Sequence, residues 1–218
     1  MRSRADCCRW KISMATLACC GSMASGRAIM EAGREDPSVF QSLIDPFSLA
    51  PGFQGPEQPR GNERIEETDF GGWSGPFMMA MINTKVVHRS NYLLDHRYGP
   101  DLVYDEMILL GPDPVDGSGD LGMDPNLQPG EGPTREERES GHYDILLRGE
   151  DEAGHVVETQ VVADLDPGYG STSKIIGEAA LALLDSSGPG GCTTPAVALG
   201  RPFIDRLREH AGVRIDIV

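Results

Sequence analysis

The 218-residue sequence is long enough for one full domain with its own hydrophobic core. Its 34 Asp and Glu residues outnumber its 19 Lys and Arg residues, so the formal net charge is −15. An acidic chain without a basic patch repels a phosphate backbone, which excludes nucleic acid as a partner. No stretch reaches the roughly 18 apolar residues of a membrane-spanning helix, so we expect a cytoplasmic protein or one peripheral to a membrane.

Residues 1–25 combine several basic residues, two pairs of neighbouring cysteines and the short apolar run MATLACC. We interpret them as a poorly ordered or non-native N-terminus, and a targeting peptide stays open as the alternative. Neighbouring cysteines lack the two-residue gap with which a C-x-x-C turn directs both sulfurs at one ion. The sequence therefore predicts no metal site.

The chain from residue 26 begins with helical and loop patterns. An amphipathic helix is predicted over 26–44, broken near Pro37 because proline cannot continue the hydrogen-bond ladder. The many prolines and glycines of 45–72 predict a long surface loop. Next, Pro76 suits the first turn of a helix, and apolar residues at helical spacing extend that helix over 76–95.

The middle of the sequence predicts strands around an acidic insert. The β-branched and aromatic residues of 102–109 favour a strand. The acidic, Gly- and Pro-rich residues 111–140 cannot bury enough surface to order themselves, so we expect a disordered insert. Two alternating segments, 142–149 and 155–163, flank the turn sequence DEAG and predict an antiparallel hairpin.

Three elements complete the chain. A helix is predicted over 169–184, and Thr194 followed by proline predicts another helix that extends to about residue 210. The final VRIDIV reads as a strand. Strands and helices are mixed along the chain without a repeated βαβ pattern, so the predicted class is α+β. We expect a mixed or antiparallel sheet packed by helices, with no complete Rossmann domain.

The stretch DPGYGSTSKIIGEAALALL, residues 166–184, raises three chemical possibilities that its spacing does not support. A phosphate-binding P-loop needs a lysine directly after the last glycine, and here Lys174 follows a serine. The dinucleotide motif G-x-G-x-x-G lacks its third glycine. A Tyr-x-x-x-Lys pair fails because Tyr169 and Lys174 are one residue too far apart. We interpret the stretch as a helix start with Ser171 or Thr172 capping free amides, and anion or carbonyl binding there stays open.

The sequence names no catalytic residue. It contains no G-x-S-x-G, H-E-x-x-H or C-x-x-C motif, and His88 and His96 are too far apart in sequence for a two-histidine metal site. The predicted helix 76–95 has an apolar stripe but also carries a cluster of polar side chains. This cluster is either a face exposed to solvent or the wall of a cleft. The candidate substrate-binding residues, chosen for polarity beside packed elements, are Asn83, Thr84, Arg89, Tyr169 and Thr172.

Four ordered blocks of the sequence resemble a known family. They are GGWSGPFMMAMINTKVVHRSNYLL, YGPDLVYDEM, DPGYGSTSKIIGEAALALL and GGCTTPAVALGRPFIDRLREHAGV. With their intervals they are similar to the C-terminal part of the saccharopine dehydrogenase-like oxidoreductases, and most of all to the trans-acting enoyl reductases among them. The resemblance covers about residues 26–218.

This resemblance implies an N-terminal Rossmann domain that holds NAD(P), followed by an α+β domain on the substrate side. It also implies hydride transfer to a carbon–carbon double bond of a glycolipid or polyketide precursor. The glycine-rich nucleotide half has no counterpart in the sequence, so NAD(P) is implied by the resemblance and no cofactor-binding residue is assigned. We therefore expect 26–218 to be a substrate-type domain of a truncated member, inactive alone.

Two functions stay open at this point. In full-length form the protein would reduce a lipid-like or polyketide small molecule with NAD(P)H. The alternative is a non-catalytic module that binds an acyl ligand or assists assembly. The sequence also leaves a homo-oligomer open.

Overall fold

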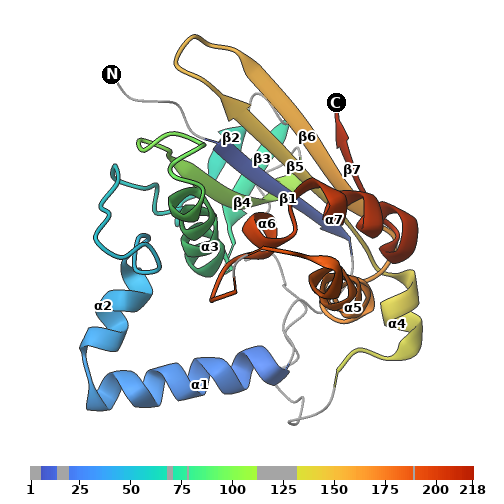
Figure 1. Ribbon diagram of the computed structural model, residues 1–218, viewed down its shortest axis with the longest axis horizontal. Helices are drawn as coiled ribbons and strands as arrows, with labels where there is room; N and C mark the ends of the chain where they lie inside the picture. Colours follow the sequence, from blue (N-terminus) through green and yellow to red (C-terminus); the bar gives the residue numbers. More distant parts are fainter. Residues whose placement is uncertain (1–5, 14–19, 68–70, 78, 112–131, 189) are drawn as a thin grey trace.

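The computed structural model describes residues 6–13, 20–67, 71–77, 79–111, 132–188 and 190–218. Within these residues, the central element of the fold is a seven-stranded sheet (Figure 1). Its strand order is β2-β3-β4-β1-β5-β6-β7. The strands are β1 (Asp6–Ser13), β2 (Ile65–Glu67), β3 (Gly72–Pro76), β4 (Tyr104–Gly111), β5 (His142–Glu150), β6 (Val156–Ala163) and β7 (Val213–Ile217). Strands β1 and β4 run parallel and the other neighbours run antiparallel, which confirms the α+β class.

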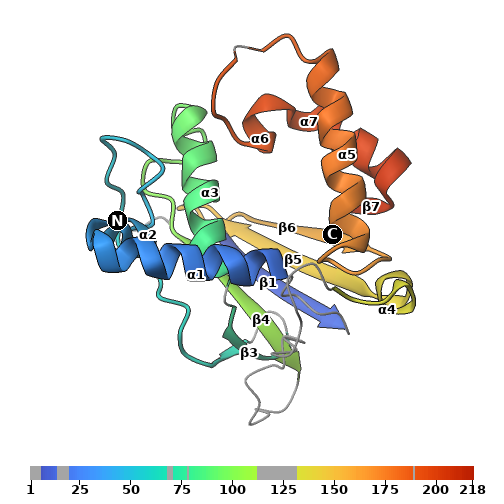
Figure 2. The same ribbon diagram turned by 90° about the horizontal axis from the view of Figure 1, so that it is seen from below.

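Helices α3, α5, α6 and α7 lie on one face of this sheet in both views (Figures 1 and 2). The helices are α1 (Cys20–Glu35), α2 (Ser38–Ile44), α3 (Ala80–Leu93), α4 (Arg135–Ser140), α5 (Gly170–Asp185), α6 (Pro195–Ala198) and α7 (Gly200–Arg206), followed by the π-helical turn Leu207–Ala211. Helix α1 lies apart from the sheet and contacts α2 (Figure 1). In the described part of the chain, none of the helices has the length and apolarity that crossing a bilayer requires.

The core lies between the sheet and the C-terminal helices. Its buried members come from four strands and the π-helical turn: Tyr104, Tyr143, Ile145, Ala163, Leu207, Ala211 and Val213. The turn ends at Gly212, whose φ of 69° is left-handed, and this allows the chain to reverse into β7. The other face of β5 and β6 carries polar pairs beside apolar residues such as Leu146 and Val162: Gln160 Nε2 donates to Asp144 Oδ2 at 2.7 Å, and Arg148 pairs with Glu158 at 2.8 Å. Alternation along the strands thus directs Tyr143, Ile145 and Ala163 toward the helices.

The first strand corrects the interpretation of residues 1–25 as a poorly ordered terminus. Residues 6–13 form β1 and pair with β4 on one side and β5 on the other. Helix α1 also begins earlier than predicted, at Cys20, and the chain breaks at Pro37 as expected. Pairing with strands about 100 to 140 residues away orders β1, and no local pattern in the sequence indicates such partners.

The helix predicted over 76–95 is shorter, and its buried face differs from the predicted one. Residues Gly72–Pro76 form β3, and α3 begins at Ala80. Met81 and Val86, two of the apolar residues whose spacing predicted this helix, are 46% and 40% exposed. The buried residues of α3 are polar instead: Lys85, His88, Ser90 and Asn91. The polar character of this face follows from its neighbours, which offer backbone carbonyls and aromatic rings.

Other predicted elements agree with the structure in part. The hairpin β5–β6, helix α5 and strand β7 are confirmed. The helix predicted from Thr194 is divided into α6, α7 and the π-helical turn. Of the acidic insert 111–140, residues 112–131 lie outside the described residues, and α4 begins with a capping box between Thr134 and Glu137. Two apolar residues of α5 are exposed, Ile176 at 67% and Leu183 at 51%.

Candidate functional site

A cavity of about 700 Å³ lies beside helix α3 and the start of strand β4. Its wall is completed by residues 44–47 and 54–61, the segment that the sequence predicted to be a surface loop. Three buried aromatic side chains line it, namely Phe47, Phe77 and Tyr104. The volume falls within the range of about 300–1,000 Å³ that is usual for small-molecule sites.

One glutamine fixes the 54–61 segment against the sheet. Gln58 Oε1 accepts a hydrogen bond from the backbone N–H of Tyr104 at 2.9 Å, and its Nε2 donates to the carbonyl of Leu102 at 3.1 Å. The side chain also donates to the carbonyl of Pro56 at 3.0 Å. Gln58 thereby pairs with the backbone just before and at the start of β4 in the way a neighbouring strand would, and it holds one wall of the cavity in place.

Aromatic contacts hold the other part of this segment to α3. The ring of Phe47 lies 4.5 Å from the ring of His88, and the ring of Phe53 lies 4.3 Å from that of His96. Burial lowers the pKa of His88 to about 4, so this side chain is neutral at physiological pH. His88 therefore acts as an aromatic packing surface for Phe47, which lines the cavity.

Lys85 is a buried cation in the cavity wall, with only 6% of its surface exposed. Its ammonium donates to the carbonyls of Leu43 and Met81. Burial lowers the pKa of Lys85, and the nearby negative charge of Asp45 opposes that shift. Leu43 lies in the last turn of α2, where free carbonyls favour a cation, so Lys85 fixes this helix against α3.

Asn83 and Glu106 form the polar part of the cavity region. Asn83 Nδ2 donates to Glu106 Oε1 at 2.9 Å and so joins α3 to β4. Glu106 lines the cavity although only 2% of its surface is exposed. Hydrogen bonding to Asn83 offsets part of the cost of burying this acidic side chain.

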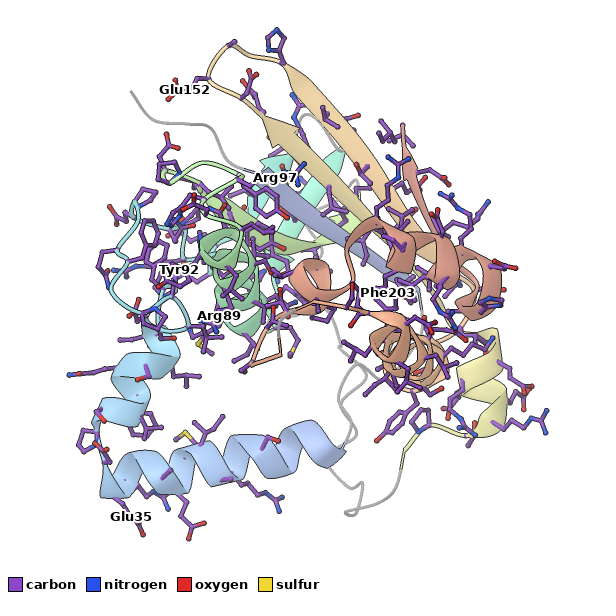
Figure 3. All side chains as sticks on the ribbon, in the orientation of Figure 1. Glu35, Arg89, Tyr92, Arg97, Glu152 and Phe203 are labelled. Atoms are coloured by element: carbon purple, nitrogen blue, oxygen red, sulfur yellow. The ribbon has the colours of Figure 1, made fainter. Side chains whose placement is uncertain are left out.

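The five candidate residues from the sequence occupy separate places. Thr84 lines the cavity, and Asn83 contacts its lining residue Glu106. Arg89 does not: its guanidinium donates to the carbonyls of Leu49 and Cys192 at 2.9 Å each (Figure 3). It thereby ties two loops to α3. The other two candidates, Tyr169 and Thr172, lie at the start of α5.

The start of α5 is capped by an aspartate that the sequence analysis missed. Asp166 is fully buried, and its carboxylate accepts hydrogen bonds from the backbone N–H groups of Gly168, Tyr169 and Gly170. Ser171, which we expected to cap amides, instead shares a 2.9 Å hydrogen bond with the hydroxyl of Tyr143. Thr172 donates to the carbonyl of Pro167 at 2.6 Å, so it caps no amide either.

This internal carboxylate decides what the helix start can bind. The N-terminus of a helix attracts anions through its free amides, and here an anionic group of the chain already occupies them. A ligand phosphate would have to displace Asp166 or lie beside its negative charge. The glycines on either side of Tyr169 therefore belong to an internal cap and do not fit a pyrophosphate.

The residues that the sequence missed are polar, and all except the half-buried Gln58 are buried. Lys85, Glu106 and Gln58 make contacts to groups distant in sequence, whereas Asp166 accepts from N–H groups two to four residues later. A signal was present only for Lys85, whose position between polar and apolar residues of one helix marks it as unusual. In the described part of the chain, no group of three or more His, Cys, Asp and Glu side chains is arranged to hold a metal ion.

Comparison with known proteins gives a consistent set of relatives. A protein of Mycobacterium tuberculosis (strain ATCC 25618 / H37Rv) described as a trans-acting enoyl reductase is 32% identical over 89% of this chain and 55% of its own length. A trans-acting enoyl reductase of Mycobacterium ulcerans is 30% identical over 87% of this chain and 54% of its own length. One from Mycobacterium bovis (strain BCG) is 28% identical over 88% and 54%.

The chain is a distant homologue of these mycobacterial proteins. It spans about half the length of the curated relatives it matches. No family model matches the chain, and no solved structure matches it.

Proposed function

We propose that this chain is the substrate-side part of a saccharopine dehydrogenase-like oxidoreductase. In full-length form such a protein would use NAD(P)H to reduce a carbon–carbon double bond of a lipid or polyketide precursor. The observation that carries the proposal is the similarity to trans-acting enoyl reductases, which extends over nearly nine tenths of the chain.

The cavity supports the substrate side of this proposal. Its aromatic lining suits an apolar chain, and Thr84 and Glu106, the latter hydrogen-bonded to Asn83, supply polar groups at one wall. The residues of this chain would bind the substrate, exclude water from it and hold its orientation. We assign no proton donor.

The nucleotide side of the proposal finds no support within the described residues. The glycine-flanked helix start of α5 is occupied by the carboxylate of Asp166. The sequence GSGDLG, residues 117–122, has the spacing G-x-G-x-x-G and comes after β4, but the Pro- and Gly-rich sequence MDPNLQPGEGP follows it where the dinucleotide motif needs a helix. We therefore derive no step through the nicotinamide, which a Rossmann half outside this sequence would hold.

A non-catalytic role remains the second candidate function. The internal cap at α5 favours it, because a chain that holds no dinucleotide can still bind an acyl ligand in its cavity. The two candidates differ in whether this chain completes an active reductase when it is joined to a nucleotide-binding half.

A chimera tests this difference. The 218-residue chain would replace the aligned part of the M. tuberculosis relative, and oxidation of NADPH would be followed with an α,β-unsaturated acyl thioester. The enzyme hypothesis expects turnover by the chimera and none by either part alone. A folded chimera that binds NADPH but never reduces the thioester, beside an active intact relative, would favour the binding module.

A further inference from the structure

Helix α5 carries apolar side chains on two faces. One face packs against α7 and the π-helical turn, and Ile175 contacts the core from it (Figure 1). On the other face Ile176, Leu183 and Leu184 are 67%, 51% and 81% exposed, and Ala180 between them is exposed as well. Positions 176, 180, 183 and 184 recur at helical spacing, so their side chains form one stripe, which we call the α5 stripe.

The α5 stripe has the properties of a surface that a partner covers. A helix that is apolar on all sides is normally buried, because each apolar face needs a partner that removes it from water. The three large aliphatic side chains expose on the order of 300 Å² of apolar surface, the size of the largest patches on soluble monomers, which are often functional. A standard interface covers about 800 Å² per partner, with an apolar centre inside a polar rim. The stripe is therefore large enough to be such a centre.

The stripe itself contains no charged side chain. In the sequence from Ile175 to Leu184, Glu178 is the single charged residue, and Arg206 Nη2 pairs with it at 2.7 Å. Two chains that each carry a net charge of −15 repel one another, so a neutral stripe is a face through which they can meet. A strongly basic or acidic partner would find no complementary charge on it.

The shape of the stripe is complementary to itself. Gly177 is exposed beside it, and a Cβ at this glycine would meet no atom within 4 Å, so the surface of the helix has a notch there. When two copies of α5 pack antiparallel with the two-fold axis at Ala180, Leu183 of one copy lies level with Gly177 of the other. In the same arrangement Ile176 lies level with Leu184. A large side chain then has room at the notch, and aliphatic side chains meet on both sides of the axis.

We propose that the α5 stripe is the interface of a homodimer, in which the α5 helices of two copies pack antiparallel around Ala180. This inference goes beyond the proposed function and depends on neither its substrate nor a nucleotide-binding half. The occupant is a second copy because it brings the same neutral, apolar stripe and the same notch in the matching order. Each contact occurs twice across the two-fold axis, so one substitution changes the interface at two places.

Sedimentation equilibrium of the full chain tests the dimer, and circular dichroism checks that each variant is folded. The wild-type chain should sediment at twice its mass of 23.5 kDa. Ile176→Lys and Leu184→Glu should each weaken association about thirtyfold or more, because they place two charges in an apolar contact. Val157→Glu, at a side chain 56% exposed in β6, is the matched control and should leave the dimer unchanged.

A mixture of the variants Ile176→Lys and Leu184→Glu tests the antiparallel arrangement. In a heterodimer the introduced amine lies level with the introduced carboxylate, and the unchanged isoleucine and leucine meet on the other side of the axis. The mixture should therefore form heterodimers that neither variant forms with itself. Leu181→Glu changes an exposed leucine of α5 outside the stripe, so its mixture with Ile176→Lys should recover no such heterodimer.

Three results would overturn the proposal. A wild-type chain that remains monomeric at about 100 μM, above the micromolar dissociation constants of the weaker standard interfaces, would leave the stripe for a nucleotide-binding half or another protein to cover. A dimer that both charged variants preserve would use another surface. Dissociation of both variants without recovery in their mixture would exclude the antiparallel pairing. None of these results bears on NADPH oxidation by the chimera, so the proposed function is tested separately.

Discussion

Replacement of Asp166 by alanine should be among the most destabilising single changes in the protein. The side chain is fully buried and accepts three backbone N–H groups, those of Gly168 and Tyr169 at 3.0 and 2.9 Å and that of Gly170. Hydrogen bonds to a charged group contribute about 1.5–3 kcal/mol each, and the loss of a helix cap costs about 1–2 kcal/mol. Water that enters the vacated space recovers part of this, so we expect a loss of about 3–5 kcal/mol.

Urea unfolding followed by circular dichroism measures this loss. For a domain of this size it corresponds to a decrease in melting temperature of about 10 °C. Asp166→Asn should also destabilise, because its amide group cannot accept from all three N–H groups. The control is Asp164→Ala, which removes an exposed carboxylate two residues away. If Asp166→Ala cost no more than Asp164→Ala, the internal cap would not be what stabilises the start of α5.

Three further changes have defined outcomes. Lowering the pH from about 6.5 to about 4 should reduce the free energy of unfolding by at most about 3 kcal/mol. Burial lowers the pKa of His88 to about 4, so over this range the histidine binds a proton in the unfolded chain before it does so in the folded protein. His88→Phe should remove this part of the pH dependence in urea titrations; an unchanged profile would point to other groups. Arg89→Ala should speed limited proteolysis near Cys192, whereas Arg97→Ala should not, and identical cleavage patterns would contradict the loop-tying role. Thr172→Ala should change the melting temperature by no more than about 1–2 °C, because its hydroxyl is exposed, and a larger change would reveal a role beyond its local hydrogen bond.

Local patterns predicted the elements that local interactions determine. The alternation in 142–149 and 155–163 reflects one face turned to the helices and one to solvent, and this pair forms β5 and β6. The start of α5 was also predicted, because Pro167 and the glycines after it mark a turn before an apolar helix. In both cases the residues that decide the structure are neighbours in sequence.

Long-range pairing decides the elements that were missed. Pro76 is compatible with a first helical turn and with the end of a strand, and pairing of β3 with β4 selects the strand. The site follows the same division. Asn83 and Thr84 could be proposed as polar residues on an apolar helix, whereas Glu106 in β4 resembles an ordinary solvated carboxylate until α3 is placed beside it. Arg89 donates to two backbone carbonyls. Every residue has a backbone carbonyl, so the sequence does not indicate which carbonyls lie near Arg89.

The place of β1 at the centre of the sheet bears on the order of folding events. Three antiparallel strands lie on each side of it, β2-β3-β4 and β5-β6-β7, and the register of β1 with both β4 and β5 joins them. Strand β1 precedes the other six strands in the chain, and its partners follow about 100 to 140 residues later, so closing these loops is slow compared with forming the β5–β6 hairpin. We expect the two outer groups to gain protection from hydrogen exchange first and β1 to gain it last; early protection of 6–13 in a pulse-labelling experiment would reverse this order. Until β1 inserts, β4 and β5 present open edges, and during that interval the nascent protein is most exposed to mispairing with other chains.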